Sequence, residues 1–406
     1  MLEDFLATFQ WLGAPTATGH VEAWHGSREP VRVPSFTNEF WTAKQRAANS
    51  LHEISYRACF KPQLPRFFVD KLTAPGDVVY DPFMGRGTTL IEAALMERVP
   101  CGCDVNPLSR VLCEPRLRPP AMSEIEAALA EVDFSEPGDL PEELEVFYHP
   151  DTLRHISALR RHLLERTAAG TLSAADRWVQ MIAVNRLTGH SPGFFSVYTL
   201  PPNQAVSPKA QAKINARRQQ APPYRDVATI ILTKSRRLLR DVSERVRHVL
   251  LRTTKGAHLI TGVSSETPQL ATDSVALAVT SPPFLDVVDY KGDNWLRCWF
   301  AGIDAASVPV TMARQVESWQ AFVTRTLTEV CRVLRPGGHV AFEVGEVRGG
   351  ALALDEIVIP AGLAAGLAPR LVMVNAQEFT KTANCWGVSN NTKGTNTNRI
   401  VLFRKP

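Results

Sequence analysis

The sequence predicts an α/β fold: a doubly wound, mostly parallel sheet that carries a helical inserted subdomain. Residues 74–105 read in order as a turn, a short apolar strand, a glycine-rich loop, a helix and a second strand. This order defines a βαβ unit, which requires parallel strands. The same alternation resumes after residue 256. The stretch between, 115–255, is too long for a crossover connection and is therefore expected to be an insertion.

Three parts follow from these limits, at residues 1–114, 115–255 and 256–406. The first contains the βαβ unit, the second is helical and basic, and the third completes the sheet. Residues 1 to about 50 show few clear periods and yield no assignment. Strands are expected at 78–81, 99–105, 276–280, 339–344, 371–374 and 400–403, and helices at 88–98, 151–166, 174–187, 226–252 and 319–334.

Composition narrows the class of protein. The 406 residues are 45% hydrophobic and 21% charged, which is ordinary for a soluble globular protein. No run of about eighteen uncharged apolar residues occurs, so no membrane span is expected. The first residues are acidic rather than basic, which disfavours a secretory signal. The seven cysteines form no CxxC pair, which indicates a reducing cytoplasm and no metal site.

Charge is unevenly distributed along the chain. The net charge is only +4, yet residues 205–255 hold thirteen Lys and Arg against three acidic residues. A basic block inside a near-neutral protein suggests a surface that faces a polyanion. A solvated helical face would give the same composition, so charge alone leaves both interpretations open.

The loop after the first strand, DPFMGRGTT at 81–89, has the composition of a ligand-binding turn. Gly85 and Gly87 lack side chains, so the backbone can turn sharply and approach a ligand. Thr88 and Thr89 can cap the helix that follows, whose free N–H groups add a polar rim. No Lys follows the second glycine, and a third glycine is missing, so neither a P-loop nor a dinucleotide fingerprint is present.

An acidic residue ends the next strand at the expected distance. Asp104 lies twenty-three residues after Asp81, where a carboxylate can accept hydrogen bonds from a ribose diol. A lone Gly-x-Gly could be a strand-to-helix turn of any α/β protein. Together with Asp81, the two threonines and Asp104, it predicts a site for a nucleoside-containing cofactor.

A second motif, Thr280-Ser281-Pro282-Pro283-Phe284, follows the strand expected at 276–280. Ligands of open parallel sheets bind beyond the carboxyl ends of the strands. The amino group of cytosine or adenine is a poor nucleophile because its lone pair is delocalised into the ring. The Ser281 hydroxyl and the Pro282 carbonyl can accept its N–H bonds, two prolines stiffen the loop, and Phe284 can stack on a flipped base.

Both motifs resemble those of the S-adenosylmethionine-dependent DNA amino-methyltransferases, the cytosine-N4 and adenine-N6 family. The resemblance implies a Rossmann-like methyltransferase sheet, S-adenosylmethionine as cofactor, and direct transfer without metal or covalent intermediate. Further runs fit the family's other elements: HEISYRACFKPQLP (52–65), DVVDYKGDNWLR (286–297), RVLRPGG (332–338), FEVGEV (342–347) and GTNTNR (394–399).

By this resemblance two sets of residues receive roles. The cofactor is expected to contact Asp81, Phe83, Gly85, Gly87, Thr88, Asp104 and Thr280. The flipped base is expected to contact Ser281, Pro282, Pro283 and Phe284. Within the family Ser-Pro-Pro accompanies cytosine N4, so the expected reaction is N4 methylation of cytosine in duplex DNA. Adenine N6 and a structured RNA stay open as alternatives. Cytosine C5 chemistry is excluded because it requires a Pro-Cys loop.

The resemblance also has departures. An acidic residue that would contact adenine is replaced by Gly262-Val263-Ser264-Ser265-Glu266. The cofactor loop precedes the catalytic motif, which places the expected target-recognition region in the insertion. There the basic helix is expected to meet DNA phosphates, which position without specifying sequence, through Arg236, Arg237, Arg240, Arg245 and Arg247. Whether a companion restriction endonuclease exists cannot be read from the chain.

Overall fold

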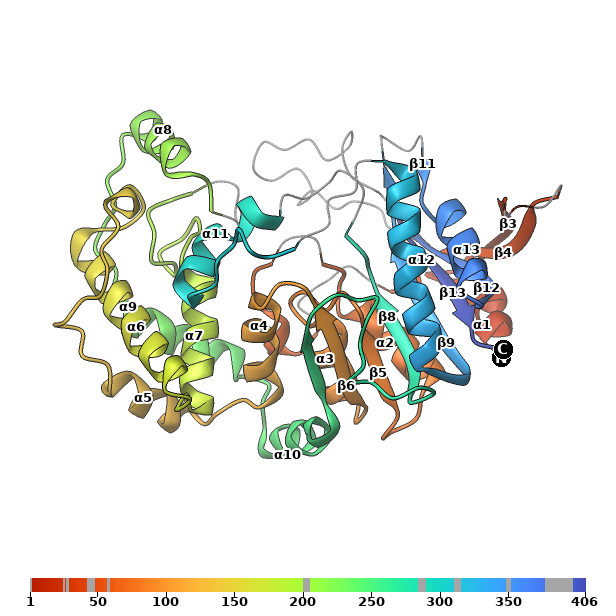
Figure 1. Cartoon of the computed structure of the whole chain (residues 1–406), viewed down its shortest axis with the longest axis horizontal. Coiled ribbons are helices and arrows are strands. Elements are labelled where there is room, and N and C mark those ends of the chain that lie inside the picture. Colours follow the sequence, from red (N-terminus) through yellow and green to blue (C-terminus); the bar gives the residue numbers. More distant parts are fainter. Residues whose placement is uncertain are drawn as a thin grey trace.

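The computed structural model describes residues 2–24, 26, 29–41, 48–56, 59–199, 205–283, 290–309, 315–347, 352–376 and 397–406. Within them a nine-stranded sheet has the order β3-β4-β12-β13-β9-β8-β5-β6-β7 (Figure 1). Its strands are β3 (Ala17–Ala23), β4 (Val31–Asn38), β5 (Val78–Asp81), β6 (Val99–Asp104), β7 (His258–Thr261), β8 (Val275–Thr280), β9 (Leu334–Val344), β12 (Ala368–Ala376) and β13 (Thr397–Arg404).

The sheet reverses its winding between β5 and β8. From β5 the chain adds β6 and then β7 on one side, and later returns to add β8 and β9 on the other, all five parallel. β13 is antiparallel to both of its neighbours, β9 and β12. This confirms the predicted doubly wound, mostly parallel α/β fold. Such a reversal opens a crevice at the carboxyl ends of the two central strands, where ligands of open sheets bind.

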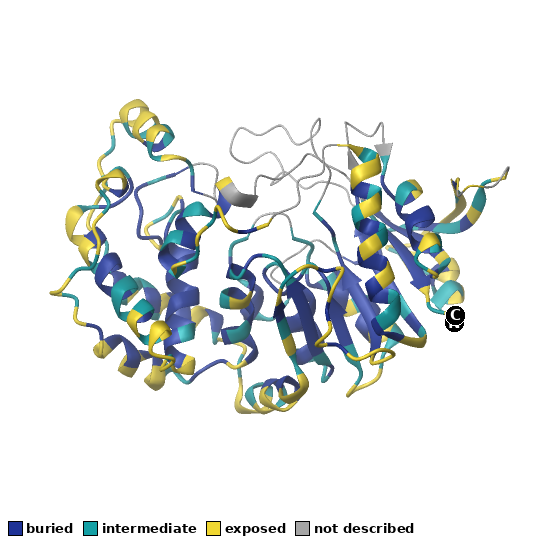
Figure 2. Cartoon of the chain, in the orientation of Figure 1, coloured by how far each residue is buried: buried dark blue, intermediate teal, exposed yellow. Residues whose placement is uncertain are grey.

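Alternating strand residues pack against helices on opposite faces of the sheet. Val79 faces the cluster that contains α1 (Leu2–Thr8), α2 (Gln63–Leu72) and α3 (Thr88–Leu95). Tyr80 faces the cluster formed with α12 (Val316–Val333) and α13 (Asp355–Ala364). Both faces are therefore covered, and the central strands are buried (Figure 2). Two-sided burial explains why these strands appear as continuous apolar runs in the sequence.

A separate helical subdomain lies beside the sheet, on the left in Figure 1. Its core includes the buried aromatic side chains Trp178, Phe147 and Tyr148. One of its helices, α11, comes from the last third of the chain and contacts α6 and α7. Its helices are α4 (Leu108–Leu117), α5 (Met122–Ala130), α6 (Pro150–Ala168), α7 (Ala174–Arg186), α8 (Pro208–Arg218), α9 (Val227–Leu238) and α11 (Tyr290–Ala301). The remaining helix of this stretch, α10 (Glu244–Thr253), lies apart from them, below the sheet and against α3 (Figure 1).

Two expectations need correction. The single basic helix expected over 226–252 is wrong: it is two helices, α9 and α10, because the Ser243 side chain accepts a hydrogen bond from Val246 N and starts a new helix. Residues 1–50, which yielded no assignment, hold α1 and the β3–β4 pair. β3 is the exposed edge of the sheet, so it lacks the apolar alternation that would have revealed it.

The remaining elements are short. Two small antiparallel pairs are β1 (Gln10–Trp11) with β2 (Ala14–Pro15), and β10 (Glu346–Val347) with β11 (Leu352–Ala353). Within the described residues, 3-10 turns span Ser50–His52, Glu142–Leu144 and Thr254–Gly256. Among the helices in the described ranges, none has the length and apolar character needed to cross a membrane.

Candidate active site

The two sequence motifs meet at the crevice between β5 and β8. The Thr280 hydroxyl donates a hydrogen bond of 2.6 Å to Oδ1 of Asp81, and the Phe83 amide donates to the same oxygen at 3.0 Å. The Thr89 hydroxyl donates to the Val279 carbonyl at 3.1 Å. These bonds fasten the glycine loop that leaves β5 to the end of β8. Burial raises the pKa of Asp81 to about 6, although its hydrogen bonds oppose the rise.

The glycines of the loop are required by its geometry. Gly85 and Gly87 both have positive φ, at 46° and 75°, which side chains disfavour. A Cβ on Gly87 would lie 2.4 Å from Sγ of Cys113, so close helix packing also excludes a side chain there. Gly87 itself caps α3, with no side-chain bond. The predicted cap by Thr88 or Thr89 is therefore wrong. Both residues belong to the first turn of α3, and the Thr89 hydroxyl bonds β8 instead.

Asp104 ends β6 beside the glycine loop. Its Oδ2 accepts a hydrogen bond from Gly85 N and its Oδ1 accepts one from Asn106 N, both at 2.9 Å. Burial raises the pKa of this carboxyl, while the two amides hold it down. Each oxygen keeps a further lone pair. The side chain is thus held in one orientation and can still accept hydrogen bonds from a hydroxyl group.

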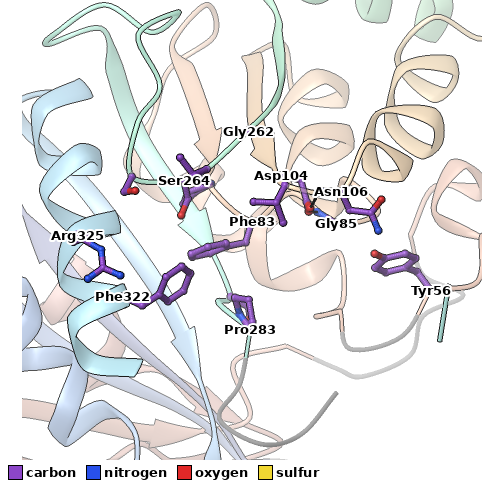
Figure 3. A pocket seen from close by; sticks show the side chains of 15 residues that line it. Tyr56, Phe83, Gly85, Asp104, Asn106, Gly262, Ser264, Pro283, Phe322 and Arg325 are labelled. Carbon is purple, nitrogen blue, oxygen red and sulfur yellow. Dashed lines mark hydrogen bonds between the residues drawn. The ribbon is translucent and has the colours of Figure 1, made fainter. Parts of the chain in front are cut away.

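A cavity of about 200 Å³ opens at this point. The rings of Phe83 and Phe322 line it side by side, with their centroids 5.5 Å apart (Figure 3). Residues from both motifs line it, together with the loop after β7 and one edge of α12. The lining consists of Tyr56, Pro82, Phe83, Gly85, Asp104, Val105, Asn106, Gly262, Val263, Ser264, Ser265, Ser281, Pro283, Phe322 and Arg325.

A smaller cavity of about 30 Å³ adjoins the first and shares Tyr56, Phe83, Gly85 and Ser281 with it. Its other lining residues are Cys59, Phe60, Asp81, Met84, Arg86 and Thr88. Ser281 therefore stands at the junction of the two cavities. Within the described ranges no group of His, Cys, Asp and Glu side chains is placed to hold a metal ion.

The serine–proline loop is held from α12. The indole N–H of Trp319 donates a hydrogen bond of 2.8 Å to the Pro283 carbonyl. No residue in the described part of the chain donates to the Pro282 carbonyl, so that oxygen can accept a bond from a ligand. Phe284, the last residue of the motif, lies outside the described residues.

A buried carboxyl stands behind the serine. Glu343, near the end of β9, is only 6% exposed. Asn398 Nδ2 donates a hydrogen bond of 2.6 Å to its Oε1, and the Ser281 hydroxyl is a second hydrogen-bonding contact. Burial raises the pKa of Glu343, and these two contacts oppose the rise. The hydroxyl that donates to a carboxylate has its oxygen lone pairs directed elsewhere, and it becomes a better acceptor.

Residues 49–56, here named the strap, connect the helical subdomain to the cavity. Five consecutive strap carbonyls accept hydrogen bonds from cationic side chains: Leu51 from Arg116, His52 and Ile54 from Arg86, Glu53 from Lys234, and Ser55 from Arg297. The Ser55 amide donates to Asn185 Oδ1 at 2.7 Å. The next residue, Tyr56, lines both cavities. Side chains from α4, α7, α9 and α11 therefore fix the position of Tyr56.

Not every predicted site residue lies at the cavities. Thr280 is fully buried behind the loop, where it bonds Asp81, and Gly87 packs on Cys113; neither lines a cavity. Pro282 is buried as well. Asp81, Phe83, Gly85, Thr88, Asp104, Ser281 and Pro283 do line one cavity or both.

The five predicted DNA-binding arginines lie away from the cavities, and four of them have partners within the protein. Arg236 pairs with Glu126, Arg237 and Arg240 pair with Glu53, and Arg247 donates to the Pro119 carbonyl. α10, which carries Arg245 and Arg247, lies near Glu97 at the edge where the strands begin, opposite the cavity (Figure 1). Their contact with nucleic acid stays a prediction.

Sequence reasoning missed several lining residues. Phe322 and Arg325 are three positions apart on α12, which reads as an ordinary amphipathic helix. Tyr56 lies in the run that resembles the family, but its aromatic ring carried no separate signal. Glu343 is visible in the sequence only as one acidic residue in an apolar strand, and that is a usable signal, since a buried carboxyl needs partners.

Comparisons with known proteins find similarity to DNA methyltransferases over part of the chain. Residues 24–109 match a family model described as DNA methylase. The type II methyltransferase M.MjaII of Methanocaldococcus jannaschii is 36% identical over 63 residues, 16% of this chain and 12% of that protein. M.MvaI of Kocuria varians, also a type II methyltransferase, is 30% identical over 97 residues, 23% of this chain and 20% of that protein.

These matches span only a small part of either relative. Among solved structures, TrmN from Thermus thermophilus is 12% identical and is covered over 55% of its length by 94% of this chain, with a TM-score of 0.33. The family model and the two relatives show a likeness to DNA methylases over part of the chain. They do not separate N4 of cytosine from N6 of adenine.

Proposed function

We propose that the protein transfers a methyl group from S-adenosylmethionine to the exocyclic N4 amino group of cytosine in duplex DNA, at specific sites and with the base flipped out. One observation carries the proposal. The glycine loop with Asp104 and the Ser281–Pro283 loop line one cavity, although almost two hundred residues separate them. A cofactor loop and a base-holding loop must share a cavity for direct transfer.

The residues present fit S-adenosylmethionine. The two oxygens of Asp104 are oriented by backbone amides and can accept the ribose hydroxyls. Phe83 and Phe322 supply flat apolar surfaces for a purine ring. Gly85, at positive φ, lets the backbone approach the ligand closely. When bound, the cofactor supplies a methyl group activated by its sulfonium.

The chain's own residues hold the amino group for attack. The Ser281 hydroxyl donates toward Glu343 and so offers its lone pairs to one N–H of the base. The Pro282 carbonyl, to which no described residue donates, accepts the other. Two acceptors draw the nitrogen lone pair out of the ring plane and into line with the methyl group. Trp319 and Asn398 keep this arrangement rigid through Pro283 and Glu343.

The choice of cytosine N4 rests on the Ser-Pro-Pro sequence. The expectation of duplex DNA rests on the family match to residues 24–109. Glu343 adds support, because it compensates for a serine hydroxyl that would otherwise be a weaker acceptor than a carboxylate. A companion restriction endonuclease would be a partner of such an enzyme, and the neighbouring genes are the place to look for it.

The test is methyl transfer from labelled S-adenosylmethionine to mixed-sequence unmethylated duplex DNA, followed by mass spectrometry of the nucleosides. N4-methylcytosine is the expected product, and Ser281→Ala should abolish it without changing cofactor affinity. N6-methyladenine would keep the site and overturn the base. Label in a structured RNA and none in DNA would overturn the substrate. No transfer to either polymer by a protein that binds the cofactor would overturn the enzyme itself.

A further inference from the structure

An isolated guanidinium is buried at the end of α7. Arg186, the last residue of this helix, is only 9% exposed, and its Nε is buried without a hydrogen-bond partner. No residue in the described part of the chain accepts a hydrogen bond from its side chain. Burial lowers its pKa to about 10, and the neighbouring Arg237 and Arg297 lower it further. A buried cation without an anion is costly, so a missing partner is indicated.

The guanidinium is held in place by an aromatic ring. The guanidinium lies over the ring of Phe194, with Cζ 4.0 Å from the ring centroid. Phe194 also packs on Gly189, where a Cβ would clash with the ring atoms. Phe195 N donates to the Arg186 carbonyl at 2.8 Å, which closes the loop onto the helix. Stacking thus fixes the plane of Arg186 and leaves its edge for a ligand.

The position of Arg186 connects it to the site of reaction. The preceding residue, Asn185, accepts the hydrogen bond from Ser55, and Tyr56 lines both cavities. Pro192 and Gly193, at the tip of the loop that carries Phe194, are exposed. The tip of this loop is therefore open to solvent.

The surface beside this loop is cationic and unpaired. Arg218 stacks on Tyr198 with its Cζ 3.8 Å from the ring centroid. Its helix, α8, carries Lys209, Lys213 and Arg217 as well and has no acidic residue. Within the described residues none of these four cations forms an ion pair. α8 is largely exposed (Figure 2) and lies at the top left of Figure 1, whereas α10 lies at the bottom, below the sheet.

We infer that Arg186 binds a phosphate of the DNA substrate, with the backbone of the strand passing over the Phe194 loop toward α8. The inference rests on the proposed function, since it names the ligand of that same site. A phosphodiester oxygen supplies the acceptor that the Arg186 edge lacks, and a planar guanidinium can bind two such oxygens at once. Phosphate contacts of this kind set the register of the DNA without reading its sequence.

The first measurement is binding of the full chain to duplex DNA over a series of salt concentrations. Arg186→Gln should weaken binding at low salt by roughly tenfold and reduce the slope of log K against log salt by about 1. Arg154→Gln, exposed on α6 in the same subdomain, removes the same charge and should change neither. Arg186→Lys retains the charge but loses the planar guanidinium. It should therefore keep the salt slope of the wild type and lose part of the affinity for DNA. Thermal melting establishes that each variant is folded.

The second measurement locates the phosphate. Duplexes that each carry one neutral methylphosphonate are bound to the wild-type protein and to Arg186→Gln. One position should weaken the wild type and leave the variant unaffected. If every position weakens both proteins equally, and the slope is unchanged, the inference is overturned while methyl transfer by the wild type still supports the proposed function. A wild-type protein that binds no duplex would overturn both. Inorganic phosphate at equal ionic strength should not compete, because a free ion lacks the rest of the strand.

Discussion

The Thr280 hydroxyl donates its 2.6 Å hydrogen bond to a carboxylate 199 residues away, on Asp81, and both side chains are almost fully buried. Asp81 ends β5 and Thr280 ends β8, so the bond spans the two strands between which the sheet reverses. The glycine loop and the Ser-Pro-Pro loop each begin at one of these residues. The relative position of the two loops is therefore set by a hydrogen bond between residues that are far apart in the sequence.

Loss of the bond between Thr280 and Asp81 should lower the free energy of unfolding. Thr280→Val keeps the shape of the side chain but leaves an oxygen of buried Asp81 without one donor, so the free energy of unfolding should fall by about 1–3 kcal/mol. Urea denaturation measures it. Thr328→Val is the matched control, because Thr328 makes a similar bond of 2.9 Å to Thr324 on the exposed side of α12. Equal losses in the two variants would contradict the importance of the buried bond.

Asp81 should also give the protein a characteristic pH dependence. Burial raises its pKa from 3.8 to about 6, so the folded protein binds this proton more tightly than the unfolded chain. The contribution to stability is complete below pH 3.8 and is lost as the pH rises through 6. Relative to Asp81→Asn, which does not titrate, the wild type should lose stability over this interval. A difference between the two that stays constant with pH would exclude the shift.

Asp104 should govern cofactor affinity. In Asp104→Asn the new NH₂ group must face a backbone N–H of Gly85 or Asn106, so the loop loses a hydrogen bond and gains a repulsion. Binding of S-adenosylmethionine, measured by calorimetric titration, should weaken by roughly tenfold or more. Asp77→Asn makes the same change at the opposite end of β5, where the carboxylate pairs with Arg335, and should leave the affinity unchanged. Similar losses in both variants would argue against a local role.

Glu343 should act as a positioning residue through Ser281. Glu343→Gln should lower kcat by roughly 10- to 100-fold while cofactor affinity stays the same, since the glutamine cannot polarise the serine hydroxyl as a carboxylate does. Because burial raises the pKa of Glu343, the wild-type rate should increase as this group ionises. The variant should lack that acidic limb. Glu356→Gln, exposed on α13, serves as the control. An unchanged pH profile in Glu343→Gln would remove the group from the mechanism.

The two basic regions should contribute unequally to DNA binding. Replacement of Lys209, Lys213, Arg217 and Arg218 by Gln should flatten the salt dependence of binding strongly, because these cations of α8 have no acidic partners among the described residues. Replacement of Arg236, Arg237, Arg240, Arg245 and Arg247 by Ala should flatten it less, because acidic residues and a carbonyl already hold four of them. The opposite order would favour the α9–α10 face as the DNA contact.

The parts of the fold that the sequence predicted are those with local signals. The βαβ unit at 74–105 and the strand before Ser281 are short, apolar and bounded by turn residues, and all are found as expected. β3 escaped because an exposed edge strand needs no apolar alternation. The break between α9 and α10 escaped because one serine cap outweighs an otherwise continuous helical period.

The candidate site divides along the same line. Asp104, Phe83 and Ser281 were identified because they belong to contiguous motifs, and they do line the cavity. Phe322 and Arg325 reach it from α12, more than two hundred residues after the glycine loop, and only tertiary packing brings them there. Arg186 could not be identified for a different reason: an arginine without a partner among the described residues looks in the sequence like any other arginine.

The strap makes the helical subdomain inseparable from the chemistry. Lys234 and Arg297 hold its carbonyls and Asn185 its amide, so the subdomain is part of the scaffold that positions Tyr56. An exchange of the insertion for that of a relative would remove Lys234 and Asn185 from the strap, and the hybrid would lose turnover even on the donor's own recognition sequence. New specificity in this protein must therefore arise by substitution within the existing insertion, or by transfer of the insertion together with residues 49–56.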